Sequence, residues 1–116
     1  MQKRLNVLFV CARNQWRSPT AEAIFRNDPR LNVRSAGVSA SARKQISVSD
    51  IEWADLICIM ENKHKQRLYS EFNGLIEMEQ VRVLDIDDLY QFMDPELIEI
   101  LQDSIAPILS EAFEGR

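Results

Sequence analysis

Near its start the chain reads Leu5-Asn6-Val7-Leu8-Phe9-Val10-Cys11-Ala12-Arg13-Asn14-Gln15-Trp16-Arg17-Ser18-Pro19, and this stretch decides the fold. Residues 5–10 are mainly apolar, as expected of a strand buried in a sheet. Cys11 follows that strand at the carboxyl edge of the sheet, where open parallel sheets place their ligand sites. A helix is predicted to begin near Ser18 and Pro19, because serine is favoured at a helix cap and proline at the first helical position.

The loop between this strand and this helix has the composition of a phosphate cradle. Backbone N–H groups of a tight loop before a helix attract an anion and favour the thiolate form of a cysteine held among them. Arg17 offers a planar fork that can hold two phosphoryl oxygens, and Ser18 is placed to donate a hydrogen bond to the sulfur. A free cysteine at a strand end is often an ordinary core residue, but that alternative explains neither the arginine nor its spacing. We therefore expect Cys11 and Arg17 to be catalytic and the phosphate-binding loop to comprise Ala12, Arg13, Asn14, Gln15, Trp16, Arg17 and Ser18.

Residues 10–22 resemble the active-site signature of the low-molecular-weight protein-tyrosine phosphatases, in the pattern Val-Cys-x-x-Asn-x-x-Arg-Ser-Pro-x-Ala-Glu. Weaker similarities follow in the same order: Ser35-Ala36-Gly37, residues 53–61 (WADLICIME), and an acidic loop after the last strand. The resemblance is to a short bacterial-type variant and covers most of the chain. It implies hydrolysis of phosphomonoesters, such as protein-tyrosine or aryl phosphates, through a cysteinyl-phosphate intermediate and without a cofactor. It also implies that Ser35 hydrogen-bonds Asn14, so Asn14, Ser18 and Ser35 are predicted to be supporting residues.

The rest of the chain alternates strand and helix signals. Further strands are predicted at residues 31–36, 56–60 and 81–86, and the main helices at residues 19–26, 61–72 and 94–113. This order predicts an α/β fold: a four-stranded parallel sheet in the flavodoxin-like order 2-1-3-4, with helices on both faces. Pro107 is expected to kink or shorten the last helix. Cys58 is expected in the core, and His64 is expected to face solvent.

Composition narrows the class of protein further. The 116 residues are predicted to form a single phosphatase-like domain, residues 1–116, as a monomer or weak dimer. A net charge of −4, with acidic residues concentrated in the second half, argues against a nucleic-acid partner. No apolar run is long enough for a membrane span and no signal peptide is evident, so a cytoplasmic location without membrane association is expected. Two cysteines in a reducing compartment and a single histidine argue against a disulfide or a metal site.

Three aspartates after the fourth strand compete for the role of general acid. In the resembled family an Asp-Pro dipeptide supplies the acid, and here Asp94-Pro95 is the only such dipeptide beyond that strand. Asp94 also has the features of a helix cap, in which its carboxylate accepts backbone N–H bonds and stays ionised. The acid should lie within about three residues of the strand end, since each extended residue advances the chain by roughly 3.3 Å. The prediction is therefore Asp88 first, Asp94 second and Asp87 third, with a solvated turn as the alternative for two of them.

The surroundings of the cradle leave several alternatives open. Tyr90 either forms an aromatic wall for the substrate or covers the edge of the core. Arg13 is predicted to contact a second anionic group, and Arg43 and Lys44 either guide an anionic substrate or form a solvated surface. An arsenate reductase-like enzyme is one alternative function, although Cys58 is poorly placed to be its resolving cysteine. A non-catalytic phosphate-binding or phosphoprotein-binding module is the other.

Overall fold

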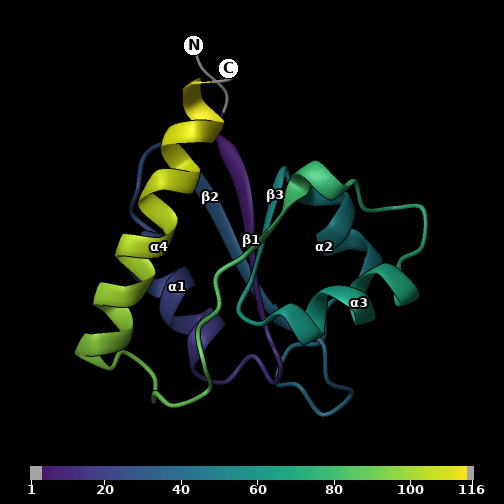
Figure 1. Ribbon diagram of the computed structural model, residues 1–116, viewed down its shortest axis with the longest axis horizontal. Coiled ribbons are helices and arrows are strands. Elements are labelled where there is room, and N and C mark those ends of the chain that lie inside the picture. Colours follow the sequence, from purple (N-terminus) through teal and green to yellow (C-terminus); the bar gives the residue numbers. More distant parts are fainter. Residues whose placement is uncertain (1–3, 115–116) are drawn as a thin grey trace.

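The computed structural model describes residues 4–114, which form one four-stranded sheet flanked by helices (Figure 1). All strand pairs are parallel and lie in the order β2-β1-β3-β4, so the predicted flavodoxin-like order is confirmed. Strand β1 is central and pairs with both β2 and β3. The strands are β1 (Leu5–Cys11), β2 (Leu31–Gly37), β3 (Leu56–Ile59) and β4 (Val81–Val83).

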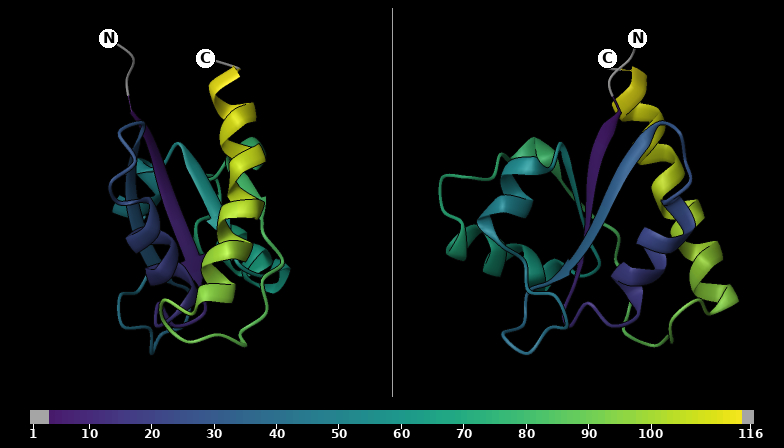
Figure 2. Two further views of the ribbon diagram at one scale, coloured as in Figure 1. Left: turned by 90° about the vertical axis from the view of Figure 1, so that its left-hand side faces the viewer. Right: turned by 180° about the vertical axis from the view of Figure 1, so that it is seen from behind.

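Helices cover both faces of this sheet, as two layers (Figures 1 and 2). Helices α1 (Arg17–Phe25) and α4 (Pro95–Glu114) lie on one face, and α2 (Val48–Trp53) and α3 (Asn62–Glu71) lie on the other. A short 3-10 helix, Met78–Gln80, precedes β4. Among residues 4–114, no helix combines the length and apolar character that crossing a membrane requires.

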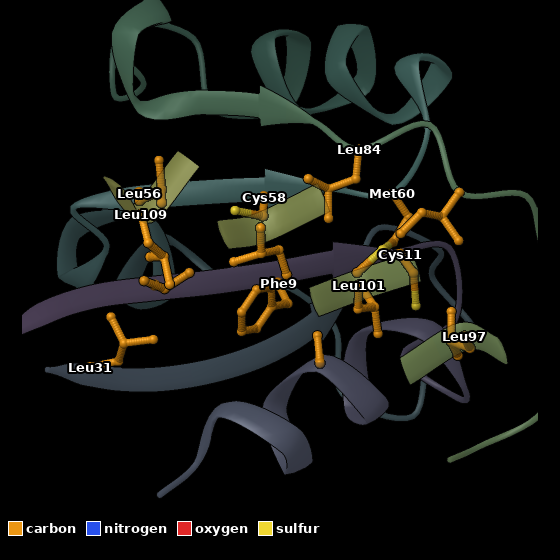
Figure 3. Close-up of a cluster of buried hydrophobic side chains, with 14 of the residues drawn as sticks. Phe9, Cys11, Leu31, Leu56, Cys58, Met60, Leu84, Leu97, Leu101 and Leu109 are labelled. Atoms are coloured by element: carbon orange, nitrogen blue, oxygen red, sulfur yellow. The ribbon is translucent and has the colours of Figure 1, made fainter. Parts of the chain in front are cut away.

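The core is divided by the alternation of side chains along β1. Its odd-numbered residues from Leu5 to Cys11 join the cluster beneath α1 and α4, whereas Leu8 and Val10 join the cluster beneath α2 and α3. Figure 3 shows the first cluster, in which Phe9 and Cys11 of β1 lie near leucines of α4. Because β1 is covered on both faces, it reads as a nearly continuous apolar run. The same burial places the sulfur of Cys11 at the end of a rigid strand.

Two helices differ from their predicted form. Helix α1 begins at Arg17, and its cap position, Trp16, makes no side-chain cap bond. Ser18 therefore lies inside the helix and is not its cap. Helix α4 continues through Pro107 to Glu114. Proline has no N–H to donate to the carbonyl four residues earlier, but Pro107 lies on the exposed side of the helix, where water can bond that carbonyl instead.

His64 is buried, contrary to the prediction that it faces solvent. Its side chain is 4% exposed, and it lies one helical turn before the buried Leu68 on α3. This thin buried stripe turns the histidine toward the sheet. Within the described residues, neither ring nitrogen has a hydrogen-bond partner.

Strand β4 ends earlier than predicted, but the chain beyond it remains attached to β3. The N–H of Leu84 donates to the carbonyl of Ile59 at 2.8 Å, and the N–H of Ile86 donates to that of Met60 at 2.8 Å. Between them, Asp85 adopts a left-handed backbone with φ of 56°. This turn directs the acidic segment 87–88 to the edge of the sheet at which β1 ends.

Candidate active site

The loop after β1 is held open by bonds to its carbonyl groups. The carbonyls of Cys11, Ala12 and Arg13 accept the backbone N–H groups of Val38, Ser39 and Arg43 at 2.9–3.0 Å. With these carbonyls directed toward the segment after β2, the loop amides are free to face inward. Helix α1 has no side-chain cap, so its first N–H groups are also available to a ligand. The loop thus has the form of an anion cradle, at the lower end of the sheet in Figure 1.

The sulfur of Cys11 lies at the floor of this cradle. The residue is 3% exposed, and its Sγ accepts the backbone N–H of Asn14 at 3.2 Å. The hydroxyl of Ser18 lies 3.0 Å from the same Sγ. Asn14 has φ of 53°, a left-handed backbone that asparagine tolerates better than most residues. The bend at Asn14 is what returns its N–H to the sulfur three residues earlier.

A chain of buried hydrogen bonds orients the hydroxyl of Ser18. Ser35 donates to Oε1 of Glu22 at 2.7 Å, so the Ser35 oxygen is free to accept Nδ2 of Asn14 at 2.9 Å. Asn14 Nδ2 also donates to Oγ of Ser18 at 2.9 Å. The proton of Ser18 then has Cys11 Sγ at 3.0 Å as a nearer acceptor than the carbonyl of Ala36 at 3.4 Å. The network therefore directs the hydroxyl of Ser18 at the sulfur, and the predicted bond between Ser35 and Asn14 is present.

Gly37 lets β2 approach the cradle more closely than any other residue would. A Cβ atom at this position would lie 2.8 Å from the backbone oxygen of Ala12, 2.8 Å from the backbone nitrogen of Asn14 and 2.6 Å from Cβ of Ala42. Contacts to backbone atoms at such distances cannot be relieved by a side-chain rotation. The glycine is thus required by the proximity of the loop.

Arg17 points its guanidinium back into the same region. Nη1 donates to Oε1 of Glu61 at 2.6 Å and to the carbonyl of Ile86 at 2.7 Å, and Nε lies 3.5 Å from Oδ1 of Asp88. The arginine is 2% exposed, so these partners fix its position. Burial raises the pKa of Glu61, but the hydrogen bond and charge of Arg17, with Lys63 and His64, outweigh burial and lower the pKa overall. Glu61 is consequently ionised and holds the arginine from behind.

Of the three competing aspartates, the structure brings Asp88 to the cradle. The small hollow above the thiol is lined by Cys11, Arg13, Gln15, Trp16, Arg17 and Asp88. Asp94 instead accepts the N–H of Glu96 at 2.9 Å and caps α4. Asp87 is exposed and does not line this hollow. Of the three, Asp88 is the one that lines this hollow, and its role as the general acid stays a prediction.

Known proteins share both this sequence pattern and this fold. Residues 6–47 match the family model for low molecular weight phosphotyrosine protein phosphatase. A protein-arginine-phosphatase of Bacillus subtilis (strain 168) is 35% identical, and the match covers 59% of this chain and 63% of that protein, so it spans less than two thirds of the relative. The chain is thus similar, over part of its length, to low-molecular-weight protein phosphatases.

Solved structures agree with this similarity. The crystal structure of YfkJ from Bacillus subtilis is 22% identical, with a TM-score of 0.74 over 99% of this chain and 98% of that one, and so shares the fold. A mutant of the YwlE arginine phosphatase with a phosphorylated active-site serine is 26% identical, with a TM-score of 0.69 over 91% of this chain and 96% of that one.

The aromatic wall predicted for the substrate is not formed by Tyr90. Tyr90 packs against the core beside α4, and burial, followed by the neighbouring carboxylates of Glu96 and Asp94, raises its pKa. It lines none of the hollows found at the cradle among the described residues. Trp16 and Phe92 are the aromatic residues that line them. Tyr90 therefore takes the alternative place considered for it, at the edge of the core.

The two basic residues after β2 have different surroundings. Arg43 donates from Nε to the carbonyl of Asn14 at 3.1 Å, so its guanidinium adjoins the loop after β1. Lys44 instead lies 4.0 Å from a carboxylate oxygen of Asp50. Only Arg43 of this pair lines a hollow beside the cradle.

The second cysteine lies in the core. Both cysteines are free and buried, and burial raises the pKa of Cys58 to about 12. The core position predicted for Cys58 is thus confirmed. Within residues 4–114 no group of three or more histidine, cysteine or acidic side chains is arranged to hold a metal ion.

Sequence reasoning missed three residues that support the candidate site. Glu22 and Glu61 both lie in the stretches that carried the resemblance, but their spacing gave no reason to pair them with Ser35 or Arg17. Arg43 was considered for substrate guidance and not as a partner of the loop. These contacts join residues 13 to 44 positions apart, and no local pattern predicts them.

Proposed function

We propose that the chain is a cysteine-dependent protein phosphatase that hydrolyses phosphomonoesters through a cysteinyl-phosphate intermediate. The observation that carries this proposal is one hollow lined by a thiol, a forked cation and a carboxylate, those of Cys11, Arg17 and Asp88. A nucleophile, an electrostatic clamp and a proton donor are the three groups that the reaction requires. The similarity to low-molecular-weight protein phosphatases supports the same reaction.

In the first step, the thiolate of Cys11 attacks phosphorus and the bond to the leaving oxygen breaks. Arg17 and the loop amides hold the three equatorial oxygens, whose charge they stabilise in the in-line transition state. The leaving oxygen takes a proton from the carboxyl group of Asp88. Asp88 is more than half exposed at the mouth of the hollow, which suits a group that meets the leaving atom.

In the second step, water attacks the phosphocysteine. The carboxylate of Asp88 removes a proton from this water, so that inorganic phosphate and the Cys11 thiolate are released. The hydroxyl of Ser18 donates to the sulfur and makes it a better leaving group. The YwlE mutant with a phosphorylated active-site serine is a relative in which the matching side chain carries phosphate, and it supports an intermediate of this kind.

We take the substrate to be a phosphorylated protein, with phosphotyrosine or another aryl phosphate as the reacting group. The matching family model, which is described as low molecular weight phosphotyrosine protein phosphatase, supports this choice. Phosphoarginine is the second candidate, because the relative from Bacillus subtilis is named as a protein-arginine-phosphatase. We further infer a cytoplasmic location, because a nucleophilic thiol must stay reduced. We take the chain to act as a monomer or weak dimer without a nucleic-acid partner.

Stopped-flow hydrolysis of an aryl phosphate tests the reaction. Wild type is expected to show a burst of product, Cys11→Ser none, and Asp88→Asn a first step at least about a hundredfold slower, as for loss of a general acid. Asp94→Asn is the matched control, since asparagine caps helices as well as aspartate does. Absence of a burst in wild type would overturn the enzyme assignment, and an inactive Asp94→Asn beside an active Asp88→Asn would overturn the choice of acid.

A pair of otherwise identical peptides decides between the two reacting groups. One carries phosphotyrosine and the other phosphoarginine, and phosphate release is measured for both. We expect the larger kcat/KM for phosphotyrosine. A larger kcat/KM for the phosphoarginine peptide would instead identify the chain as an arginine phosphatase that uses the same nucleophile.

A further inference from the structure

A second hollow adjoins the cradle and is larger than the space above the thiol. It has a volume of about 320 Å³ and is lined by Arg13, Gln15, Ser41 and Arg43. Arg13 and Gln15 also line the hollow that contains Cys11, so the two hollows are neighbours that share these residues. A ligand held in the cradle therefore has the second hollow beside it.

Two cations of this hollow have no acidic partner. None of the ion pairs formed among residues 4–114 includes Arg13 or Arg43. Both side chains are exposed, so neither charge has been neutralised by burial in the protein. The hollow presents two guanidinium groups beside a loop that already attracts anions.

The side chain of Arg43 is also held in place before a ligand arrives. Arg43 donates from Nε to the carbonyl of Asn14 at 3.1 Å, and its Nη2 lies 3.5 Å from Oδ1 of the same residue. The backbone N–H of Arg43 donates to the carbonyl of Arg13 at 3.0 Å. This bond joins the two arginine-bearing segments, so binding there needs little further ordering.

A third hollow continues the surface toward an apolar side chain. It has a volume of about 310 Å³ and is lined by Gln15, Pro19, Arg43 and Phe92. Phe92 is 51% exposed. A cradle, a basic hollow and a partly apolar hollow thus share lining residues in succession, and this variety of surfaces suits a peptide better than a single small anion.

We propose that the hollow between Arg13 and Arg43 receives a carboxylate side chain next to the phosphorylated residue, so that the enzyme prefers phosphoproteins with acidic flanking residues. This inference rests on the proposed function and adds a substrate class to it. The recognition is an exposed charge pairing, which changes affinity by a modest factor. We expect about a fivefold preference for an acidic over a neutral neighbour.

Three phosphopeptides that differ only beside the phosphorylated residue test the proposal. The neighbour is glutamate, glutamine or lysine, and kcat/KM is measured for wild type, for Arg13→Gln/Arg43→Gln and for Lys44→Gln. Lys44 is the matched control, because it is an adjacent cation that faces Asp50 and does not line the hollow. We expect a glutamate-to-glutamine ratio of about 5 in wild type and in Lys44→Gln, and near 1 in the double variant. A ratio within one protein is insensitive to a general loss of catalytic power.

A binding experiment separates this inference from the proposed reaction. The same peptides, fluorescently labelled, are titrated with Cys11→Ser, which retains the cradle without the nucleophile. A tighter Kd for the glutamate peptide supports the acidic subsite even if wild type hydrolyses none of the peptides, in which case only the proposed reaction fails. Equal values for all three peptides, or a preference that survives in the double arginine variant, would overturn the subsite.

Discussion

Nη1 of Arg17 lies 2.6 Å from Oε1 of Glu61, and this ion pair joins the first turn of α1 to the residue that precedes α3. The arginine is 2% exposed and the glutamate side chain 22% exposed, so the pair is largely shielded from water. The carbonyl of Ile86 accepts a second bond from the same nitrogen at 2.7 Å. The guanidinium is consequently fixed by two segments that lie far from it in the sequence.

Replacement of Glu61 by glutamine should reduce kcat more than it changes KM. The amide retains the shape of the side chain but not its charge, so Arg17 loses the partner that orients its fork in the transition state. We expect kcat for an aryl phosphate to fall about tenfold or more, as for other single-donor losses in active sites. Lys63→Gln is the control, because Lys63 is exposed and lies 3.5 Å from the other oxygen of Glu61. Wild-type kcat in Glu61→Gln would show that Arg17 is positioned without this residue.

Replacement of Gly37 by alanine should damage the cradle. The new Cβ would lie within 2.8 Å of backbone atoms of Ala12 and Asn14, so either the loop or β2 has to move. We expect a loss of about 1–3 kcal/mol in the free energy of unfolding, measured with urea, and a larger relative loss of aryl phosphate hydrolysis.

Gly74→Ala provides the comparison for that experiment. Gly74 has φ of 83°, but a Cβ there would meet nothing within 4 Å. This variant should lose about 1 kcal/mol through backbone strain and keep its activity while folded. Equal activity losses in the two alanine variants would contradict the role given to Gly37.

His64 should make the protein less stable as the pH falls. Burial is the main cause that lowers its pKa below the usual value, with Arg17, Lys63 and Arg67 acting in the same direction and Glu61 against it. The unfolded chain then binds a proton that the folded chain resists, so stability is lost as the pH falls below about 6.5. His64→Leu also removes two ring nitrogens that lack partners among the described residues. We expect this variant to be more stable than wild type, by a larger margin at pH 5.5 than at pH 8, in urea unfolding. An unchanged margin would rule out titration of His64.

Thiol labelling should distinguish the two cysteines. Cys58 is fully buried with a pKa raised to about 12, so it should resist iodoacetamide at pH 8 in the folded protein. Cys11 should be alkylated first, and inorganic phosphate should slow the reaction by occupying the cradle. Cys58→Ala is expected to keep hydrolytic activity. Loss of turnover in Cys58→Ala without loss of folding would instead revive a resolving role for this cysteine.

The strand order and the loop were predictable because both depend on local patterns. An apolar strand, a turn and a helix start are visible in residues 5–19, and alternating strands and helices leave few topologies. The burial of His64 was mispredicted because α3 is mostly polar and has few apolar residues. In such a helix the sequence does not indicate which polar residue lies beside the buried apolar ones. Glu61 and Ile86 could not be predicted as partners of Arg17 for a different reason. Their contacts with Arg17 depend on how the segments after β3 and β4 pack against the cradle, which only tertiary structure determines.

The groups that shape the cradle are spread over most of the chain. The loop carbonyls are held by residues 38–43, and the arginine by Glu61 and Ile86. A nascent chain that has released only its first forty residues contains the whole signature motif but lacks most of what gives it shape. The complete cradle requires about three quarters of the polypeptide, up to Ile86, so a chain cut short of that residue would keep the motif without the partners that fix Arg17.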